Sequence, residues 1–411
     1  MRIVISQKIR EVLTPGAAED SLDFVRQVEN PSLILDRYAA IWRDRAEHEE
    51  RSEREAEQRA RQSFLDALVR RRLPATASEA RRRWFESLAL DPRAAVVVAR
   101  LQGRLIVNQA ASVLENAGLA LDRTFGVPYI PGSAVKGVTR AWAVSEARAG
   151  RTALREVLAV FGWGQAAHDQ QLLQEAQVDS KTAAASFGGL VAFLPAYPLE
   201  EAPLGLDIVN CHHREYYDRK LEAALDVELP VPNVFPVVEA GARFFFTVRA
   251  TTREGALDWV RSALGLASFD PVERARTWLE RALAEHGIGA KTAAGYGWFQ
   301  VDREATRGFI EGVRQAAEAA RAAAEQQRRE EERRRSLTPE ALAREQIAAL
   351  DSEGFAHFAR ALPEKTEVEQ RAFLAELRET RADRWRTWRK RKPDLAEAIE
   401  KVARRLGEEL P

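Results

Sequence analysis

The chain has few of the residues that mark secreted, redox-active or membrane-spanning proteins. Its 411 residues include one cysteine, Cys211, and one methionine. A single cysteine excludes an internal disulfide and is typical of a protein kept in a reducing cytoplasm. No stretch approaches the roughly 18 consecutive apolar residues of a membrane span, and residues 1–10 lack the apolar core of a signal peptide. We therefore expect a cytoplasmic protein with no membrane contact.

An excess of charge is also missing. The 62 Lys and Arg residues balance 62 Asp and Glu residues, so the chain lacks the basic surplus of a typical free RNA-binding protein. Any nucleic-acid site must then be a local patch. Lysine itself is scarce, with 9 Lys against 53 Arg. Two of the nine, Lys136 and Lys291, lie in glycine-rich segments, which makes those segments the first candidates for an anion site.

Glycine is concentrated in residues 286–297, H-G-I-G-A-K-T-A-A-G-Y-G. Because glycine costs about 0.5–1 kcal/mol relative to alanine in regular structure, such density favours close approach of the backbone to a ligand, often an anion. The nucleotide P-loop pattern does not fit, since Ala290 precedes Lys291 and the segment runs from a helix into a strand. Gly287 is expected simply to end the preceding helix, as its C′ residue.

A second glycine-rich segment is 126–140, G-V-P-Y-I-P-G-S-A-V-K-G-V-T-R. Ser133 is expected to cap the helix that follows it. Lys136 then falls in the first turn, where the helix dipole disfavours a cation, and Gly137 costs about 1 kcal/mol relative to alanine. Two unfavourable residues together indicate an anion site at this helix start. For Gly137 alone, close packing of the helix on a sheet explains the residue equally well.

These two segments occur in order with two further motifs, L-D-I-V-N-C-H-H-R-E-Y-Y at 206–217 and P-V-P-N at 230–233. The ordered set resembles the RAMP superfamily of CRISPR RNA-binding proteins. It is similar to the last-numbered RAMP subunit of the type III-B (Cmr) effector complex. The resemblance covers roughly residues 95–303. Each motif alone is weak, whereas the ordered combination is specific.

The resemblance implies a modified ferredoxin-like core related to the RNA recognition motif. It implies a non-catalytic subunit that binds guide (CRISPR) RNA near the end distal to the repeat-derived tag. Such a subunit contacts other RAMP and Cmr subunits, meets target RNA through the complex, and uses no cofactor or metal. Related subunits that cleave RNA have an acid before the P-G-S motif, and neither Glu115 nor Asp122 aligns with it. We therefore expect no enzymatic activity.

The candidate RNA-binding residues come from both glycine-rich segments and from the histidine–tyrosine motif between them. They are Gly132, Ser133, Lys136, Arg140, His212, Tyr216, Gly289, Lys291, Thr292, Gly295, Tyr296 and Gly297.

Two other functions remain open from the residues. His212 and His213, with Tyr216 and Tyr217 nearby, are compatible with a metal-independent endoribonuclease. Adjacent histidines on a strand point to opposite faces, so they share one reacting group only if they lie in a loop. A zinc site at Cys211 is disfavoured, because the usual ligand spacing and a second ligand pair are missing. The other alternative is a scaffold that contacts only proteins.

The residues alone indicate an α+β fold. The expected elements are strands at 95–107, 190–194, 243–248 and 296–301, with helices at about 133–149 and 271–286. Their order is that of a split βαβ unit. Phe244 and Phe246 are expected on one sheet face and Phe245 on the other. Aromatic residues on such sheets can stack on RNA bases, but core packing is the favoured interpretation.

The flanks read as mainly helical, so the expected domains are residues 1–90, 91–303 and 304–411. Helices are expected at about 38–72 and 78–90, then a solvated, charged helix at 310–335 and a small bundle that begins at Thr338 and Pro339. Trp385 and Trp388 lie in a basic run near the C-terminal end. They can stack on bases or bind a protein partner, although packing in the core of the bundle is favoured.

Overall fold

The computed structural model describes residues 75–110, 117–224, 231–251, 255–266 and 268–411, and isolated positions among the first 74 residues. The chain forms two compact units, Met1–Arg314 and Gln315–Pro411. No helix in the described ranges is long and apolar enough to cross a membrane. Each unit is described by itself below.

The first unit is built on an antiparallel sheet with strand order β4-β8-β3-β9. Its strands are β3 (Ala94–Leu101), β4 (Val191–Phe193), β8 (Arg243–Ala250) and β9 (Phe299–Val301), and β5 (Tyr197–Pro198) also pairs with β8. Helix α6 (Gly132–Arg148) follows β3, and α12 (Pro271–Glu285) links β8 to β9. The expected order of strand, helix, strand, strand, helix, strand is therefore observed.

Three strands are shorter than their apolar patterns predict. β4 covers Val191–Phe193 rather than 190–194. β3 ends at Leu101 rather than at Val107, and β9 begins at Phe299 rather than at Tyr296. Residues 102–107 leave the sheet because their backbone bonds elsewhere, for example from the N–H of Leu105 to the carbonyl of Val238 at 2.9 Å.

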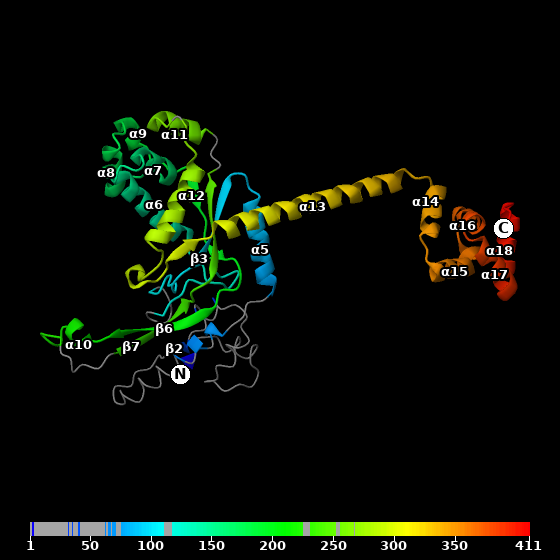
Figure 1. Ribbon diagram of the computed structural model, residues 1–411, viewed down its shortest axis with the longest axis horizontal. Coiled ribbons are helices and arrows are strands. Elements are labelled where there is room, and N and C mark those ends of the chain that lie inside the picture. Colours follow the sequence, from blue (N-terminus) through cyan, green and yellow to red (C-terminus); the bar gives the residue numbers. More distant parts are fainter. Residues whose placement is uncertain are drawn as a thin grey trace. The chain divides into compact units, whose positions relative to one another are not determined.

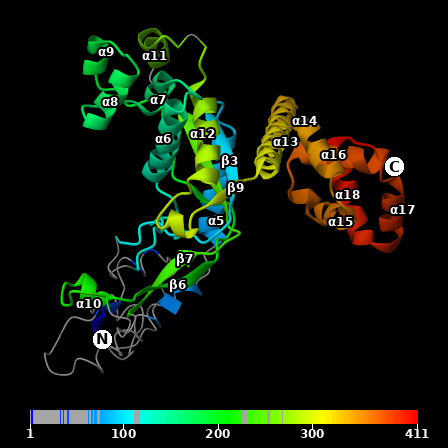
Figure 2. The same ribbon diagram turned by 60° about the vertical axis from the view of Figure 1, so that its left-hand side comes forward.

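Helices α6 and α12 cover one face of this sheet and lie side by side in both views (Figures 1 and 2). Phe244 and Phe246 of β8 pack into the core beneath them. α12 begins as its sequence predicts. Asp270 accepts the N–H groups of Val272 and Glu273 at 3.0 Å, and Pro271 occupies the first position.

The other face of the sheet is covered by different elements, α5 (Ala75–Ala89) and the first turns of α13 (Arg303–Ser336). Phe245 of β8 is fully buried there. Its ring centroid lies 4.4 Å from that of Phe85 in α5 and 5.3 Å from that of Phe309 in α13. All three phenylalanines of β8 are thus core residues, as expected.

Several elements are inserted between the sheet strands. Helices α7 (Leu154–Phe161), α8 (Ala167–Glu175) and α9 (Ser180–Ala184) separate α6 from β4, and α11 (Ala256–Leu264) precedes α12. Strands β6 (Leu204–Cys211) and β7 (Val231–Val238) form a separate antiparallel hairpin that projects from the sheet, with the short helix α10 (Arg214–Tyr217) near its end (Figure 1).

The expected helix at 38–72 falls mostly outside the described residues. Among the first 74 residues, β1 (Arg2–Ile3) pairs with β2 (Ala40–Ile41), so the start of the expected helix is a strand. The helix expected at 78–90 is α5.

The second unit has its own core. α13 runs for 34 residues with no buried side chain, as its charged sequence predicts. It leads into α14 (Pro339–Ala348), α15 (Ser352–Ala361), α16 (Glu367–Glu379), α17 (Ala382–Arg391) and α18 (Pro393–Leu406). Thr338 caps α14, as expected. Trp385 and Trp388 are 2% and 4% exposed within this bundle, which confirms core packing as their role.

Candidate nucleic-acid interface

The glycine-rich loop 287–297 is attached to the segment that follows β3. The N–H of Ala290 donates to the carbonyl of Ile106 at 2.8 Å, and the N–H of Gly297 donates to the carbonyl of Arg104 at 2.7 Å. Inside the loop, the N–H of Ile288 donates to the carbonyl of Gly297 at 2.8 Å. These bonds fix the loop against the end of the sheet.

Most of the glycines in this loop are required by the protein itself. A Cβ at Gly289 would overlap the carbonyl oxygen of Ile106, and one at Gly297 would overlap that of Ile288. Both residues also have positive φ angles, as does Gly287, which ends α12 as expected. The hypothesis that these glycines admit a ligand is therefore unnecessary for Gly289 and Gly297, because internal backbone contacts explain them.

The outer part of the loop is different. A Cβ at Gly295 would meet nothing within 4 Å. Lys291 is exposed and holds a left-handed φ of 58°, which is uncommon for a side chain other than glycine. The backbone N–H groups of Lys291, Thr292 and Ala293 have no acceptor among the described residues. Consecutive free N–H groups beside a lysine can hold an anion such as a phosphate.

Tyr296 fastens the loop to the β6–β7 hairpin through a polar network. Its hydroxyl donates to Asp207 Oδ2 at 2.6 Å, and Arg104 lies 2.8 Å from the same carboxylate and 3.1 Å from Glu239. Burial, followed by the hydrogen bond to Asp207 and the charge of that residue, raises the pKa of Tyr296 to about 12. Burial alone would raise the pKa of Asp207, but the hydrogen bonds from Tyr296 and Arg104 outweigh it and lower that pKa. Tyr296 is therefore an anchor of the loop.

The start of α6 is built differently from its prediction. The helix begins at Gly132, with Pro131 at the N-cap position and no side-chain cap, so the expected capping by Ser133 is wrong. Ser133 is exposed in the first turn. Gly132 has a structural reason, because a Cβ there would overlap the carbonyl of Phe193 in β4. The proline fixes the extended conformation before the helix, which leaves no position for a serine cap.

Lys136 lies half-buried in the first turns of α6. It has no ion pair with any residue that the structure describes, and burial lowers the pKa of its ammonium, with the nearby positive charge of Arg140 adding to the effect. Arg140 is itself paired with Asp169 at the start of α8. Arg140 is thus partly neutralised, whereas Lys136 makes no ion pair with a described residue and is attracted to Asp169 only from a greater distance.

Gly137 is exposed on the same helix, and a Cβ there would meet nothing within 4 Å. Close packing of α6 on the sheet therefore does not explain this glycine. The alternative is that Gly137 leaves the helix backbone uncovered next to Lys136.

The two glycine-rich segments belong to helices that pack against each other. The Trp142 ring of α6 lies 5.0 Å from the ring of His286, the residue directly after α12. No described hydrogen bond or ion pair joins loop 287–297 to residues 132–140. The structure thus supplies two cationic positions on neighbouring elements.

The third group of candidates lies elsewhere, beyond the strands of the β6–β7 hairpin. His212 and Tyr216 are exposed there, together with Tyr217 at 71% exposure. Ile208 and Val209 on β6 are also exposed. His212 and Tyr216 are therefore accessible, and their role in RNA binding stays a prediction.

Sequence reasoning missed Arg104, Asp207 and Glu239 as supports of the loop. Their positions carry no local signal, because the network forms only when β6, β7 and the segment after β3 come together. Asp122, considered above as a possible catalytic acid, stabilises its own turn. Its carboxylate accepts the N–H groups of Thr124 and Phe125 at 2.8 Å and the hydroxyl of Tyr197 at 2.9 Å. Glu115 lies outside the described residues.

Comparison with known proteins agrees with the family suggested by the motifs. Residues 100–300 match the family model of the RAMP superfamily. The CRISPR system Cmr subunit Cmr6 of Pyrococcus furiosus is 27% identical over 240 residues, which are 48% of this chain and 65% of that protein. The matched part thus spans just under two thirds of the relative's length.

Among solved structures, a cryo-EM structure of type III-B Cmr-beta bound to cognate target RNA contains a chain with 17% identity and a TM-score of 0.40. That match covers 64% of this chain and 78% of the other. A crystal structure of Cmr6 from Pyrococcus furiosus matches with 23% identity and a TM-score of 0.28, over 50% of this chain and 97% of the other. Because both scores lie below 0.5, the relation to RAMP proteins is drawn from the sequence matches.

Proposed function

We propose that this chain is a non-catalytic structural subunit of a type III-B CRISPR effector, and that it binds the guide RNA near the end distal to the repeat tag. In this proposal it is the last-numbered RAMP subunit, works in the cytoplasm, contacts other RAMP and Cmr subunits, and meets target RNA through the complex. The observation that carries the proposal is the rigidly held loop 287–297, within the part of the chain that matches RAMP proteins. This loop has an exposed Lys291 and three consecutive N–H groups without a described acceptor.

The binding mode is contact with phosphates rather than reading of bases. Both faces of the β4-β8-β3-β9 sheet are covered, so the aromatic residues of β8 cannot stack on RNA as they do in sheets with an open face. Lys136, Lys291 and free backbone N–H groups recognise charge without regard to base identity. This mode suits a subunit that must accept guides of any sequence.

The sheet is proposed to be the modified ferredoxin-like core of a RAMP protein. Its support is the strand order β4-β8-β3-β9, with α6 and α12 as the two crossover helices on one face. This arrangement places both glycine-rich segments on or directly after the crossover helices.

The absence of catalysis is proposed because the candidate groups for cleavage are otherwise engaged or dispersed. Asp122 already accepts three hydrogen bonds within its own turn and from Tyr197. His212 is exposed, and the described residues contain no group of three or more His, Cys, Asp or Glu side chains that could hold a metal ion. The alternative is a metal-independent endoribonuclease that uses His212 or His213.

Labelled repeat RNA incubated with the purified chain separates these two functions. We expect the RNA to stay intact over hours, with or without divalent metal. Cleavage that disappears in either His212→Ala or His213→Ala would transfer the assignment to the endoribonuclease.

Crosslinking in the assembled complex tests RNA binding against the protein-only scaffold. We expect guide RNA to crosslink to peptides that contain residues 132–140 and 287–297. A complex whose guide crosslinks only to the other subunits would make this chain a scaffold.

A further inference from the structure

The helical unit carries an outward row of cations on α17 and the residue after it. This basic face consists of Arg386, Arg389, Lys390, Arg391 and Lys392, all of which are exposed. Trp385 and Trp388 point into the bundle core, so Arg386 and Lys390, four residues apart, lie on the opposite side of the helix. Residues 384–392 contain six cations and no acid.

Several other arginines of this unit are instead held by contacts within it. Residues 315–411 contain 21 basic and 20 acidic side chains, and the arginines near α16 are paired. Arg371 bonds Glu367 and Glu408 at 3.0 and 2.9 Å. Arg381 donates to the carbonyls of Ala348 and Leu350 and lies over the Phe355 ring at 4.2 Å. These contacts hold the bundle together.

The basic face has few such contacts. Lys390, Arg391 and Lys392 make no ion pair with any described residue. Arg386 bonds Asp383, whose side chain is 97% exposed, and Arg389 reaches Glu400 only at 3.9 Å. Most of the positive charge of this face is thus not neutralised by the protein.

Helix stability does not account for so many cations. One cation in the last turn gains about 0.3–1 kcal/mol from the helix dipole. Like charges four residues apart, as in Arg386 and Lys390, cost about 0.2–0.5 kcal/mol. Further cations therefore work against the helix, which indicates a ligand of opposite charge.

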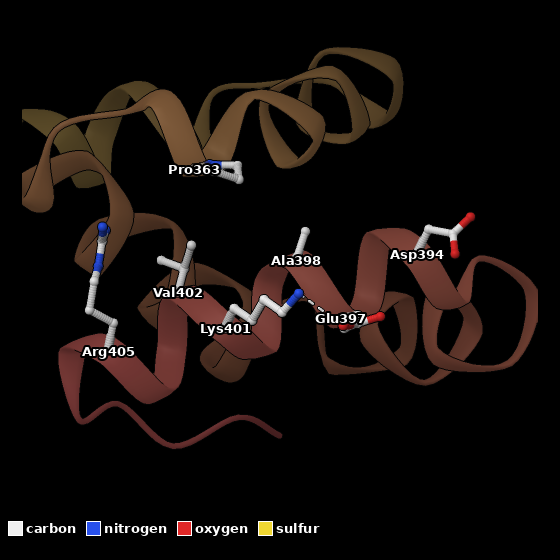
Figure 3. Close-up of a pocket in the computed structure, with 7 residues that line it drawn as sticks. All are labelled: Pro363, Asp394, Glu397, Ala398, Lys401, Val402 and Arg405. Carbon is white, nitrogen blue, oxygen red and sulfur yellow. Dashed lines mark ion pairs between the residues drawn. The ribbon is translucent and has the colours of Figure 1, made fainter.

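The nearby groove on α18 has another character. Its volume is about 360 Å³, and its lining mixes Asp394 and Glu397 with Lys401 and Arg405 (Figure 3). Lys401 is paired with Glu397 at 2.9 Å. A polyanion is not favoured there, so the basic face is the distinct feature of this unit.

We propose that the basic face is a second RNA-binding site, which holds the phosphates of single-stranded RNA independently of the loop and α6 positions in the first unit. A protein or membrane partner is disfavoured, because no apolar or aromatic side chain is exposed within residues 384–392 and both tryptophans are buried. A surface of lysine and arginine without aromatic residues suits a phosphate backbone. The choice of RNA among polyanions rests on the proposed function.

The test compares two full-length variants with equal changes in net charge. One carries Arg386→Glu, Lys390→Glu and Arg391→Glu. The control carries Arg321→Glu, Arg335→Glu and Arg360→Glu, which are exposed cations of the same unit without described ion pairs. Binding of fluorescent single-stranded RNA is measured by anisotropy across salt concentrations, and unchanged melting temperatures verify that both variants fold.

Three lost phosphate contacts at about 0.7 each lower the salt slope by about 2. The ratio of the RNA-binding constant of the parent chain to that of the basic-face variant then falls on the order of twentyfold between about 50 and 200 mM salt. The control variant is expected to keep the parent slope. Equal slopes in the two variants, whether reduced or unreduced, would overturn the proposal.

The same comparison in a Lys136→Ala, Lys291→Ala background separates this inference from the proposed function. If the basic face is independent, its reversal lowers the slope by the same amount in both backgrounds. If Lys136→Ala, Lys291→Ala leaves the salt slope unchanged while the basic-face substitutions lower it, the site in the first unit is excluded and the basic face remains. If only the two lysine substitutions lower the salt slope, the basic face is excluded and the site in the first unit remains.

Discussion

The two glycine-rich segments of the first unit look alike in sequence but differ in what their glycines do. In loop 287–297, Gly289 and Gly297 let the backbone pass close to other parts of the chain. In α6, only Gly132 has that role, while Gly137 faces open space. Each segment also holds one lysine without a described ion pair. Glycine density is therefore a mixed signal, and only the surroundings of each missing Cβ separate internal packing from an open surface.

This difference has a practical use. Substitutions at the packed glycines report on folding, whereas those at the open glycines and the two lysines report on binding. The following predictions use that contrast, beginning with the largest expected effect.

Gly297→Ala is expected to destabilise the first unit by about 3 kcal/mol or more, because the new Cβ would overlap the Ile288 carbonyl at a φ of +70°. Chemical denaturation measures the change. Gly295→Ala is the matched control, with a φ of +90° and open space, and should lose only about 1–2 kcal/mol from backbone strain. Equal losses in the two variants would show that the loop adjusts its backbone, and the packing account would fail.

Lys136→Ala and Lys291→Ala are each expected to weaken binding across unrelated single-stranded RNA sequences. Each should flatten the salt slope by about 0.7, the value for one lost phosphate contact. Lys181→Ala, which removes an exposed lysine at the start of α9, provides the control. If the salt slope of Lys136→Ala or Lys291→Ala matches that of Lys181→Ala, that lysine does not contact a phosphate and is excluded from the site.

Tyr296→Phe should cost about 1 kcal/mol, because it removes a charge-assisted hydrogen bond to Asp207 at a partly exposed position. Its dependence on pH is specific. The raised pKa of Tyr296, about 12, gives stability that is present below about pH 10 and is lost as the pH rises towards 12.

The lowered pKa of Asp207 gives stability that is present above about pH 4 and is lost as the pH falls further. The difference in unfolding free energy between the parent and Tyr296→Phe should therefore shrink at both extremes, as measured by urea denaturation across pH. A difference that stays constant from acid to alkaline pH would contradict the network.

Gly137→Ala should have the smallest effect and the opposite sign. Alanine gains about 0.5–1 kcal/mol in a helix, and no atom lies within 4 Å of the new Cβ. If RNA approaches this bare backbone, the variant should melt higher and bind RNA more weakly. Higher stability with unchanged RNA affinity would exclude Gly137 from the interface.

The fold was predictable where local signals were strong. The capping residues Asp270 and Pro271 predicted α12, and the apolar run of β8 predicted a buried strand. The end of β3 was not predictable, because residues 102–107 stay apolar while their backbone pairs with the glycine loop and with Val238. The predicted Ser133 cap failed because Pro131 occupies the capping position.

The candidate site was only partly predictable for a similar reason. Glycines and lysines are visible in sequence, whereas the bonds of Tyr296 and Arg104 to Asp207 depend on a hairpin far away along the chain. Sequence therefore indicates where a loop is unusual, but tertiary contacts decide which of its residues face outward.

The double cover of the sheet has a consequence for inherited variation in this protein. Because Phe245 is packed against Phe85 and Phe309, Phe245→Ala should cost about 3–5 kcal/mol and lower the amount of folded protein rather than one activity. Substitutions at Lys136 or Lys291 should leave the fold intact and change the affinity for RNA. Variants of this chain should therefore fall into two classes, one with a lower amount of folded protein and one with a normal amount and altered RNA affinity.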